Sequence, residues 1–289
     1  MTKLLIFNPE HDLCLAHANR HYVAPRSAVE YARSSCAVML PLCPDAVCTS
    51  AYDPLPTVDT PTVIVPWGWN ITLKQQLLQL GADPSLLPDD DTLHRLRQLQ
   101  HRSTLLPLQP DCMAATSIQE VEAALADGHG QAVLKAPWSG AGRGLRFVGG
   151  NLSPLDRTWI DKTLCNQQCV MVEPRRDVVL DFALEYLCSD GQLHFIGFSA
   201  FNTANGVYRN NLELTDMQIE QLVLSLTAPH ALDNLRAEAE PWLESNIAAH
   251  YSGPLGLDLM ACRNGTIAVA EHNMRYTMGM VAHAKINRL

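Results

Sequence analysis

The stretch LGLDLMACRNGTIAVAEHNMR, residues 255–275, restricts the fold of this chain more than any other segment. Runs of alternating apolar and polar residues flank its Asn264-Gly265 pair, and Asn-Gly between such runs is the strongest short-range signal for a β-hairpin. A two-residue loop at this position pairs Arg263 with Thr266. The sequence therefore predicts two antiparallel strands joined by a tight turn.

This register brings two acidic residues together. Counting back from the loop places Asp258 opposite Glu271, with Asn273 on the same strand face as Glu271. Facing carboxylates lie roughly 5 Å apart at their Cβ atoms and repel each other, and a divalent cation between them relieves the repulsion. Two carboxylates and an amide oxygen suit Mg²⁺. A solvated hairpin with two unrelated acids is the alternative. Apolar neighbours favour a buried sheet: Leu257, Leu259, Ile267 and Val269.

A second segment, AVLKAPWSGAGRGL at residues 132–145, places a lysine at the end of an apolar run and three glycines after it. No Lys-Ser/Thr follows the glycines, as a Walker A loop requires, and the next residues are typical of a strand, not of a Rossmann helix. We predict a hairpin whose tip, with Gly140, Gly142 and Gly144, closes over phosphate oxygens while Lys135 supplies a positive charge. A solvated surface turn with an unrelated lysine is the alternative.

The first hundred residues predict a small open-sheet α/β domain. Residues 3–8 and 62–65 are typical of buried strands, and the proline-rich segment before the second strand is expected to be extended loop. Asn70 caps a helix that stops at Gly81, and Asp91 opens another helix.

Two loops of this domain follow strands, and ligands of open parallel sheets bind beyond the carboxyl ends of the strands. NPEHD and PWGWN are therefore candidate walls of a substrate site. In the first loop, His11 and Asp12 are equally consistent with substrate binding and with loop capping. In the second, Trp67 and Trp69 are expected to pack rather than to bind ligand.

From about residue 103 the pattern changes to strands interrupted by helices. VVLDFALEYL (178–187) alternates cleanly, with Asp181, Ala183 and Glu185 on one face. Ser117 with Glu120, and Thr215 with Gln218, are capping boxes that begin helices. The first of these helices stops at the glycine of residue 128, and a longer helix at about 231–250 is expected to bend at Pro241. The predicted strands are 131–136, 144–148, 169–173, 178–187, 193–201, 256–262 and 266–272.

Composition excludes several classes of protein. The net charge of −9 argues against binding to a nucleic-acid backbone. The nine cysteines are an odd, scattered set without metal-ligand spacing, so reduced thiols are expected. We find no transmembrane run and no secretory leader, and we expect a cytoplasmic protein.

With these motifs in place, residues 100–289 resemble the ATP-grasp superfamily. The resemblance is carried, in the family's order, by VLKAPWSGAGRG, VMVEPRRDVVLDFALEYL and GLDLMACRNGTIAVAEHNMR. It implies an N-terminal α/β domain at 1–102 and an ATP-grasp domain at 103–289. Within the latter it implies a nucleotide lid subdomain at about 103–174 and a metal-binding subdomain at about 175–289.

The resemblance also implies roles in binding ATP. Lys135 matches the strand lysine that touches the α and β phosphates, and the loop 139–144 matches the phosphate lid. VMVEP matches the linker that holds the adenine edge. The nucleotide-binding residues implied in the lid and the linker are Ser139, Gly140, Gly142, Gly144, Glu173, Pro174 and Arg175.

The same comparison implies a metal and ribose site. Asp258, Glu271 and Asn273 match magnesium ligands, with Mn²⁺ as an alternative ion. Asp181 matches the residue that meets the ribose, although Asp177 competes with it in EPRRDV. Arg275 matches the arginine that faces the transferred phosphate.

Two further arginines are assigned on the same basis. The family's first nucleotide lysine is missing, and Arg102 is its best substitute. Arg209, in the loop FNTANGVYRNN, is a candidate for binding the γ-phosphate or the substrate carboxylate, although a plain connection explains this loop equally well. His272 points away from Glu271 and is expected to be a core histidine.

The resulting expectation is an ATP- and magnesium-dependent ligase. A small-molecule or peptide carboxylate is activated as an acyl phosphate, and an amine or thiol captures it, with Arg275, Lys135 and Arg209 as the catalytic residues. A small-molecule kinase on the same fold and a non-catalytic nucleotide-binding regulatory protein are the alternatives. The identity of the acid, the identity of the nucleophile and the oligomeric state stay open.

Overall fold

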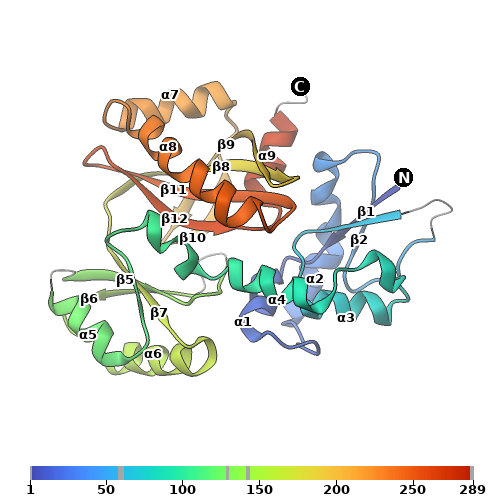
Figure 1. Cartoon of the computed structure of the whole chain (residues 1–289), viewed down its shortest axis with the longest axis horizontal. Coiled ribbons are helices and arrows are strands. Elements are labelled where there is room, and N and C mark those ends of the chain that lie inside the picture. The colour runs from blue at the N-terminus through green and yellow to red at the C-terminus, as the bar shows by residue number, and fades with distance from the viewer. Residues whose placement is uncertain (1, 58–61, 128–129, 141–143, 287–289) are drawn as a thin grey trace.

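Three β-sheets organise the described part of the chain, which comprises residues 2–57, 62–127, 130–140 and 144–286 of the computed structural model. A three-stranded sheet lies in the N-terminal part, a four-stranded sheet follows, and a five-stranded sheet comes last. Figure 1 shows the two later sheets facing each other, with the N-terminal part beside them. No helix in the described ranges is long and apolar enough to cross a membrane.

The N-terminal sheet is parallel, with β1 (Thr2–Phe7) between β2 (Val47–Ser50) and β3 (Thr62–Pro66). Its helices are α1 (His11–His17), α2 (Arg26–Ser35), α3 (Ile71–Gln79) and α4 (Asp90–Leu99). Asn70 caps α3 as predicted, because its side chain accepts from the Leu73 N–H at 2.9 Å. The prediction of one strand in the proline-rich segment is wrong, since β2 is a second strand. Short 3₁₀ helices cover Cys36–Leu42, Pro84–Leu86 and Arg102–Leu108.

The smaller, antiparallel sheet has the order β4-β7-β5-β6. Its strands are β4 (Met113–Ala115), β5 (Gln131–Lys135), β6 (Leu145–Gly149) and β7 (Val170–Pro174), and β4 was not predicted. The helices α5 (Ile118–Ala126) and α6 (Pro154–Gln167) pack on one face of it. Ser117 caps α5, but the predicted capping box is wrong, because Glu120 accepts from the Thr116 N–H instead. The predicted stop at residue 128 lies outside the described residues.

The larger sheet has the order β10-β9-β8-β11-β12. Its strands are β8 (Val178–Ser189), β9 (Gln192–Ala204), β10 (Val207–Asn211), β11 (Gly253–Cys262) and β12 (Ile267–Asn273). The apolar face packs against α7 (Asp216–Leu226) and α8 (Ala231–Leu243), and α9 (Met278–Ile286) ends the described chain. The capping box of Thr215 and Gln218 is confirmed. The helix predicted to 250 continues through Pro241 and then changes to a π turn at Glu244–Ala248.

The hairpin of β11 and β12 places Asp258 opposite Glu271, as predicted. The two-residue loop that led to this prediction is wrong, because the Cys262 N–H donates to the Thr266 carbonyl at 2.9 Å and closes a three-residue loop. Further along, the ladder shifts between Asp258 and Leu259, so that Ala270 is an extra residue in a β-bulge. The three-residue loop shifts the strand pairing by one residue, and the extra residue of the bulge shifts it back before Asp258 and Glu271.

Candidate active site

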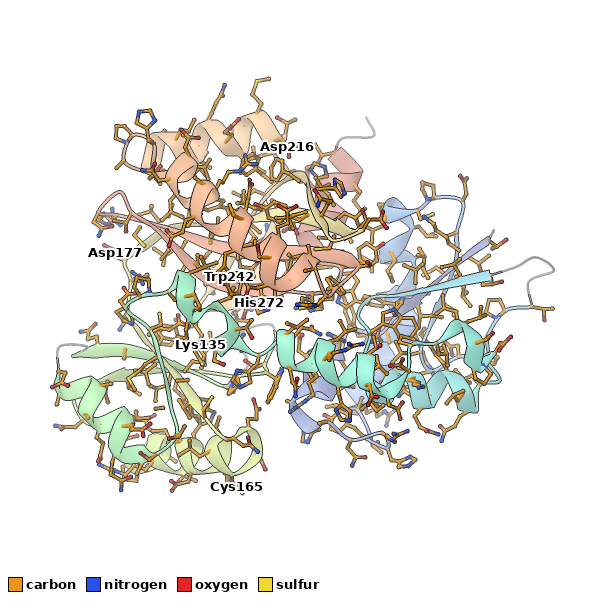
Figure 2. All side chains as sticks on the ribbon, viewed as in Figure 1. Lys135, Cys165, Asp177, Asp216, Trp242 and His272 are labelled. Atoms are coloured by element: carbon orange, nitrogen blue, oxygen red, sulfur yellow. The ribbon has the colours of Figure 1, made fainter. Side chains whose placement is uncertain are left out.

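A cavity of about 420 Å³ lies between the smaller and the larger sheet. Lys135 of β5 and Glu173 of β7 line it from the smaller sheet, and Asp181, Asp258 and Glu271 line it from the larger one. Figure 2 shows Lys135 between the two sheets. Polar groups from both sheets therefore face one space whose volume is typical of ligand pockets; we call it the site cavity.

Lys135 is held at the end of β5 by two partners. Its Nζ lies 2.7 Å from a Glu173 carboxylate oxygen, and the two side chains are only 10% and 5% exposed. The same Nζ donates to the Ala270 carbonyl at 3.3 Å. Ala270 is the bulged residue of β12, and a bulge frees a carbonyl from regular ladder pairing. The position of Lys135 thus depends on both sheets.

An apolar wall lines the same cavity, and the sequence analysis missed it. Val133, Leu145 and Phe147 come from β5 and β6, the strands that flank the glycine-rich loop. Gly206, in the β9–β10 turn, is so close that a Cβ there would lie 2.5 Å from a Leu145 methyl carbon. The turn of the larger sheet therefore closes against the smaller sheet. Alternate residues of a strand lie on the same face, so the position of Val133 two residues before Lys135 could have predicted that it lines the same cavity.

Of the two aspartates that compete for the ribose, Asp181 is the one that lies deeper. It accepts from the Thr203 hydroxyl at 2.7 Å, and burial raises the pKa of its carboxyl. Asp177 also lines the cavity, but its exposed carboxylate is paired with Arg263 at 2.7 Å. Among the described residues, Asp181 therefore has a hydroxyl partner and no ion pair, whereas Asp177 has an ion pair.

The facing acids Asp258 and Glu271 have opposite pKa shifts. Removal from solvent, with the charge of Glu271 nearby, raises the pKa of Asp258 well above its ordinary value, although the Asn273 amide donates to it at 3.1 Å. Removal from solvent also opposes ionisation of Glu271, but the charges of Arg102 and Lys135 outweigh it and lower that pKa. Within the described ranges, no three His, Cys, Asp or Glu residues form a metal-binding group. The metal ligands predicted from the sequence, Asp258, Glu271 and Asn273, are not such a group, because the third ligand is an amide.

Arg102 supplies the positive charge beside these acids. Its guanidinium forms an ion pair with Glu271 and donates to the Ala136 carbonyl at 2.6 Å. It also donates to the Ser139 hydroxyl at 2.7 Å and to the Ser139 carbonyl at 2.8 Å. Arg102 therefore links the start of the glycine-rich loop to β12, a role that the sequence did not predict.

Arg275 follows β12 and pairs with the N-terminal part of the chain. Its Nε and Nη2 atoms lie 3.2 Å and 3.0 Å from the two carboxylate oxygens of Asp12. Arg209, in contrast, is exposed on β10 and does not line the site cavity. Neither arginine lines the site cavity, but Arg275 is largely buried and paired with Asp12, whereas Arg209 is exposed.

The glycine-rich loop is described on both sides of residues 141–143. A Cβ on Gly140 would lie 1.9 Å from an oxygen of Asp12, and a Cβ on Gly144 would lie 2.3 Å from the Ser139 hydroxyl. Both positions therefore need glycine for close packing. Gly142 lies outside the described residues.

Pro174 and Arg175, at the end of β7, line the site cavity beside Glu173. The Arg175 guanidinium lies 5.6 Å from the centre of the Phe147 ring. The linker between the two sheets is therefore part of the cavity wall.

The two histidines considered from the sequence are structural. His11 is buried between Gln100 and Asn70, both at 3.0 Å, and burial lowers its pKa. His272 pairs with the Leu99 carbonyl at 2.7 Å, and burial lowers its pKa to about 4. The prediction of a core histidine at 272 is confirmed.

The nine cysteines are free. Four of them are buried, whereas Cys165 is exposed on α6, on the outer side of the smaller sheet (Figure 2).

Two α/β layers that clasp a cavity, with a strand lysine on one side and paired acids on the other, form the ATP-grasp fold. Solved structures with this fold match almost the whole chain. D-cycloserine synthetase matches with a TM-score of 0.56 and 12% identity, covering 99% of this chain and 99% of that one. D-alanyl-alanine synthetase A from Vibrio cholerae matches with a TM-score of 0.54 and 14% identity, covering 98% and 91%.

A third match contains a nucleotide. The biotin carboxylase domain of Hydrogenobacter thermophilus 2-oxoglutarate carboxylase, in complex with MgADP, ADP and bicarbonate, has a TM-score of 0.53 and 12% identity, covering 99% of this chain and 69% of that one. Identities at this level establish the fold alone. No family model matches the sequence, and no curated protein matches it significantly.

Proposed function

We propose that this chain is an ATP- and magnesium-dependent ligase that activates a carboxylate as an acyl phosphate for attack by an amine or a thiol. The observation that carries the proposal is the site cavity, where Lys135 of one sheet faces Asp258 and Glu271 of the other. A cation on one wall and paired acids on the other suit a phosphate chain bridged by a metal ion. A structure with this fold that holds MgADP adds support.

The nucleotide is assigned to the residues that line the cavity. Lys135 binds phosphate oxygens, Asp181 accepts from the ribose hydroxyls, and the linker Glu173 to Arg175 borders the adenine. The apolar wall of Val133, Leu145 and Phe147 supports the base by contact with its face. Ser139, Gly140 and Gly144 do not line the site cavity, and we assign their backbone to the phosphates only because they flank the loop that follows Lys135.

Asp258, Glu271 and Asn273 would hold Mg²⁺, and Mn²⁺ accepts the same oxygen ligands. The fit rests on the donor set: Asp258 faces Glu271 across β11 and β12, and Asn273 lies two residues beyond Glu271 on the same face. Burial and the charge of Glu271 also raise the pKa of Asp258, and a cation would relieve that repulsion. When bound, the ion supplies positive charge to the phosphate oxygens. Arg102 forms an ion pair with Glu271 and offsets part of its negative charge. The net negative charge that Asp258 and Glu271 would present to the ion is therefore less than two.

The reaction assigned to the site has two steps. An oxygen of the substrate carboxylate attacks the γ-phosphorus, the bond from that phosphorus to the bridging oxygen breaks, and ADP leaves with the electron pair. The amine or thiol then attacks the carbonyl carbon, phosphate leaves, and the proton of the nucleophile passes to solvent. Arg275 and Lys135 stabilise the negative charge of the transferring group, and no protein nucleophile is needed. Arg209 has no part in this assignment because it is exposed.

The first test is nucleotide binding measured by titration calorimetry with ADP, with and without Mg²⁺. Lys135→Met alone would leave Glu173 buried and unpaired, so the double variant Lys135→Met/Glu173→Gln is the better probe. A charge-assisted hydrogen bond contributes about 1.5–3 kcal/mol, so we expect the affinity for MgADP to fall about tenfold or more. Lys162→Met, on an exposed position of α6, is the matched control. Equal affinity in the double variant and the control would remove Lys135 from the site.

The second test separates ligation from phosphorylation. Candidate acids are added to the protein with MgATP, and ADP release is measured with and without hydroxylamine as a general nucleophile. A ligase gives a hydroxamate, whereas a kinase releases ADP and a stable phosphorylated product. A protein that binds MgATP without turnover under either condition supports the regulatory alternative.

A further inference from the structure

Asp12 is a nearly buried carboxylate whose charge partner comes from the far end of the chain. It lies in the first turn of α1, directly beyond β1, and it pairs with Arg275, which follows β12. The two side chains are 20% and 14% exposed. Removal from solvent opposes ionisation of Asp12, but the charge of Arg275 outweighs it and lowers the pKa of the carboxyl. The pair is therefore ionised and fixed in one geometry.

This pairing occupies a particular edge of the arginine. Asp12 accepts from Nε and Nη2, and the Tyr276 carbonyl accepts from Nη1 at 3.1 Å. A guanidinium has five N–H donors. Among the described residues, one N–H on each terminal nitrogen therefore has no named acceptor and can donate to an anion.

The same carboxylate contacts the glycine-rich loop. A Cβ on Gly140 would lie 1.9 Å from Asp12 Oδ2 and 2.7 Å from its Cγ. A small cavity of about 20 Å³, large enough for one water molecule, adjoins this contact. Asp12, Ser139 and the proposed metal ligands Glu271 and Asn273 line that cavity. Asp12, which belongs to the N-terminal part, therefore contacts both Gly140 of the glycine-rich loop and Arg275.

We propose that Asp12 is the positioning residue of Arg275: it holds the guanidinium by its Nε–Nη2 edge, so that the arginine keeps one orientation next to the proposed metal ligands for stabilising the transferring phosphoryl group. The proposal rests on the proposed ATP-dependent function. Asp12 itself touches neither nucleotide nor acid in this assignment. The close packing of Gly140 against Asp12 makes the position of this carboxylate depend on the backbone at Gly140.

The test uses MgADP with aluminium fluoride, which mimics a phosphoryl group in transfer, and so needs no knowledge of the acid. We measure the dissociation rate of labelled ADP with and without fluoroaluminate and define the trapping gain as the ratio of the two rates. We expect Asp12→Asn to retain MgADP affinity within about twofold, because Asp12 does not line the site cavity. Its trapping gain should fall at least tenfold, because the neutral amide cannot fix the guanidinium by two ionic hydrogen bonds.

Two further variants make the test strict. Asp90→Asn removes another first-turn aspartate of the N-terminal part, one that pairs with Arg20 and Lys74 away from both cavities, and it should keep the full gain. Gly140→Ala displaces the Asp12 carboxylate without changing its charge and should reduce the gain like Asp12→Asn. If Asp12→Asn does not fold, Asp12→Glu carries the test: it keeps the charge but moves the carboxylate relative to Arg275, and it should retain MgADP affinity while it loses trapping gain.

The outcomes separate this inference from the proposed function. A parent protein that does not bind MgADP overturns both. A parent that binds and traps, together with an Asp12→Asn variant of equal trapping gain, overturns only the role of Asp12. A variant that loses MgADP affinity and trapping in equal proportion shows a structural role for Asp12 and also overturns the proposal.

Discussion

At the scale of single residues, Glu185 is a buried acid of the larger sheet that forms no ion pair among the described residues, although the charge of Arg275 acts on it. It is 1% exposed, and one oxygen accepts from the Ser199 hydroxyl at 2.8 Å and from the Thr277 hydroxyl at 3.0 Å. The other oxygen is buried and has no hydrogen-bond partner in the described structure. Burial raises the pKa of this carboxyl to about 7. The alternation along β8 predicted that Glu185 lies on the same face of the strand as Asp181. It did not predict that one oxygen of Glu185 lacks a hydrogen-bond partner among the described residues.

This shift predicts a pH dependence of stability. The folded pKa of about 7 lies above the ordinary value of 4.5, so the folded state binds this proton more tightly than the unfolded state does. The resulting stabilisation is fully present below pH 4.5 and is lost as the pH rises through about 7, and it amounts to about 3 kcal/mol.

The check compares the parent with Glu185→Gln by urea denaturation at several pH values, without nucleotide or metal. We expect the free energy of unfolding of the parent, relative to that of the variant, to fall by about 3 kcal/mol between pH 4.5 and pH 7.5. A difference that is constant across this range would mean that Glu185 titrates as an ordinary surface acid.

At the scale of elements, two of the three hairpins in the larger sheet, β8–β9 and β11–β12, show how local signals can mislead. Asp190-Gly191 forms the two-residue turn between β8 and β9, with φ of +52° and +76° at its two residues. Asn264-Gly265 was predicted to form the same turn, yet only Gly265 has a positive φ there, of +82°. The Arg263 N–H donates to the Asp177 carbonyl at 2.8 Å instead of pairing across the hairpin. A partner 86 residues away, also the ion-pair partner of Arg263, thus lengthens the loop.

These turns give a prediction with a built-in control. Alanine at a positive φ costs about 1 kcal/mol. Gly191→Ala meets nothing within 4 Å and should lose about that much stability. Gly265→Ala carries the same backbone cost and also meets the Ala228 nitrogen at 3.2 Å, so it should lose more. Urea denaturation of both variants checks the order, and equal losses would mean that the Ala228 contact relaxes freely.

The same contrast explains how much of the site could be predicted. Lys135, Asp258, Glu271 and Asn273 lie on strands whose alternation is local, so their faces followed from the sequence. The pairing of Asp258 with Glu271 was right although the loop was wrong, because the bulge at Ala270 compensated. The partners of these residues could not be predicted, since Arg102 and Glu271 are 169 positions apart and meet only through the packing of two sheets.

At the scale of the whole molecule, two of the buried hydrophobic clusters include residues on both sides of the proposed boundary at residue 102. Leu93 and Leu96 of α4, which precede the boundary, belong to the same buried cluster as the apolar face of the larger sheet. In the other direction, Val281 of α9 packs with Leu5 and Phe7 of β1. Two parts that complete each other's cores are expected to lose structure together.

We therefore expect one cooperative unfolding transition, reported equally by probes in both parts. Single-tryptophan variants that keep only Trp67, in the N-terminal part, or only Trp242, on α8, should show the same urea midpoint. Leu77→Ala, in a core confined to the N-terminal part, and Leu96→Ala, in the shared core, should each cost about 2–5 kcal/mol. If the parts are coupled, each substitution lowers the midpoint of both probes. If Leu77→Ala lowers the Trp67 midpoint and leaves that of Trp242 unchanged, the parts unfold independently, and the contacts of α4 and α9 contribute too little to join them.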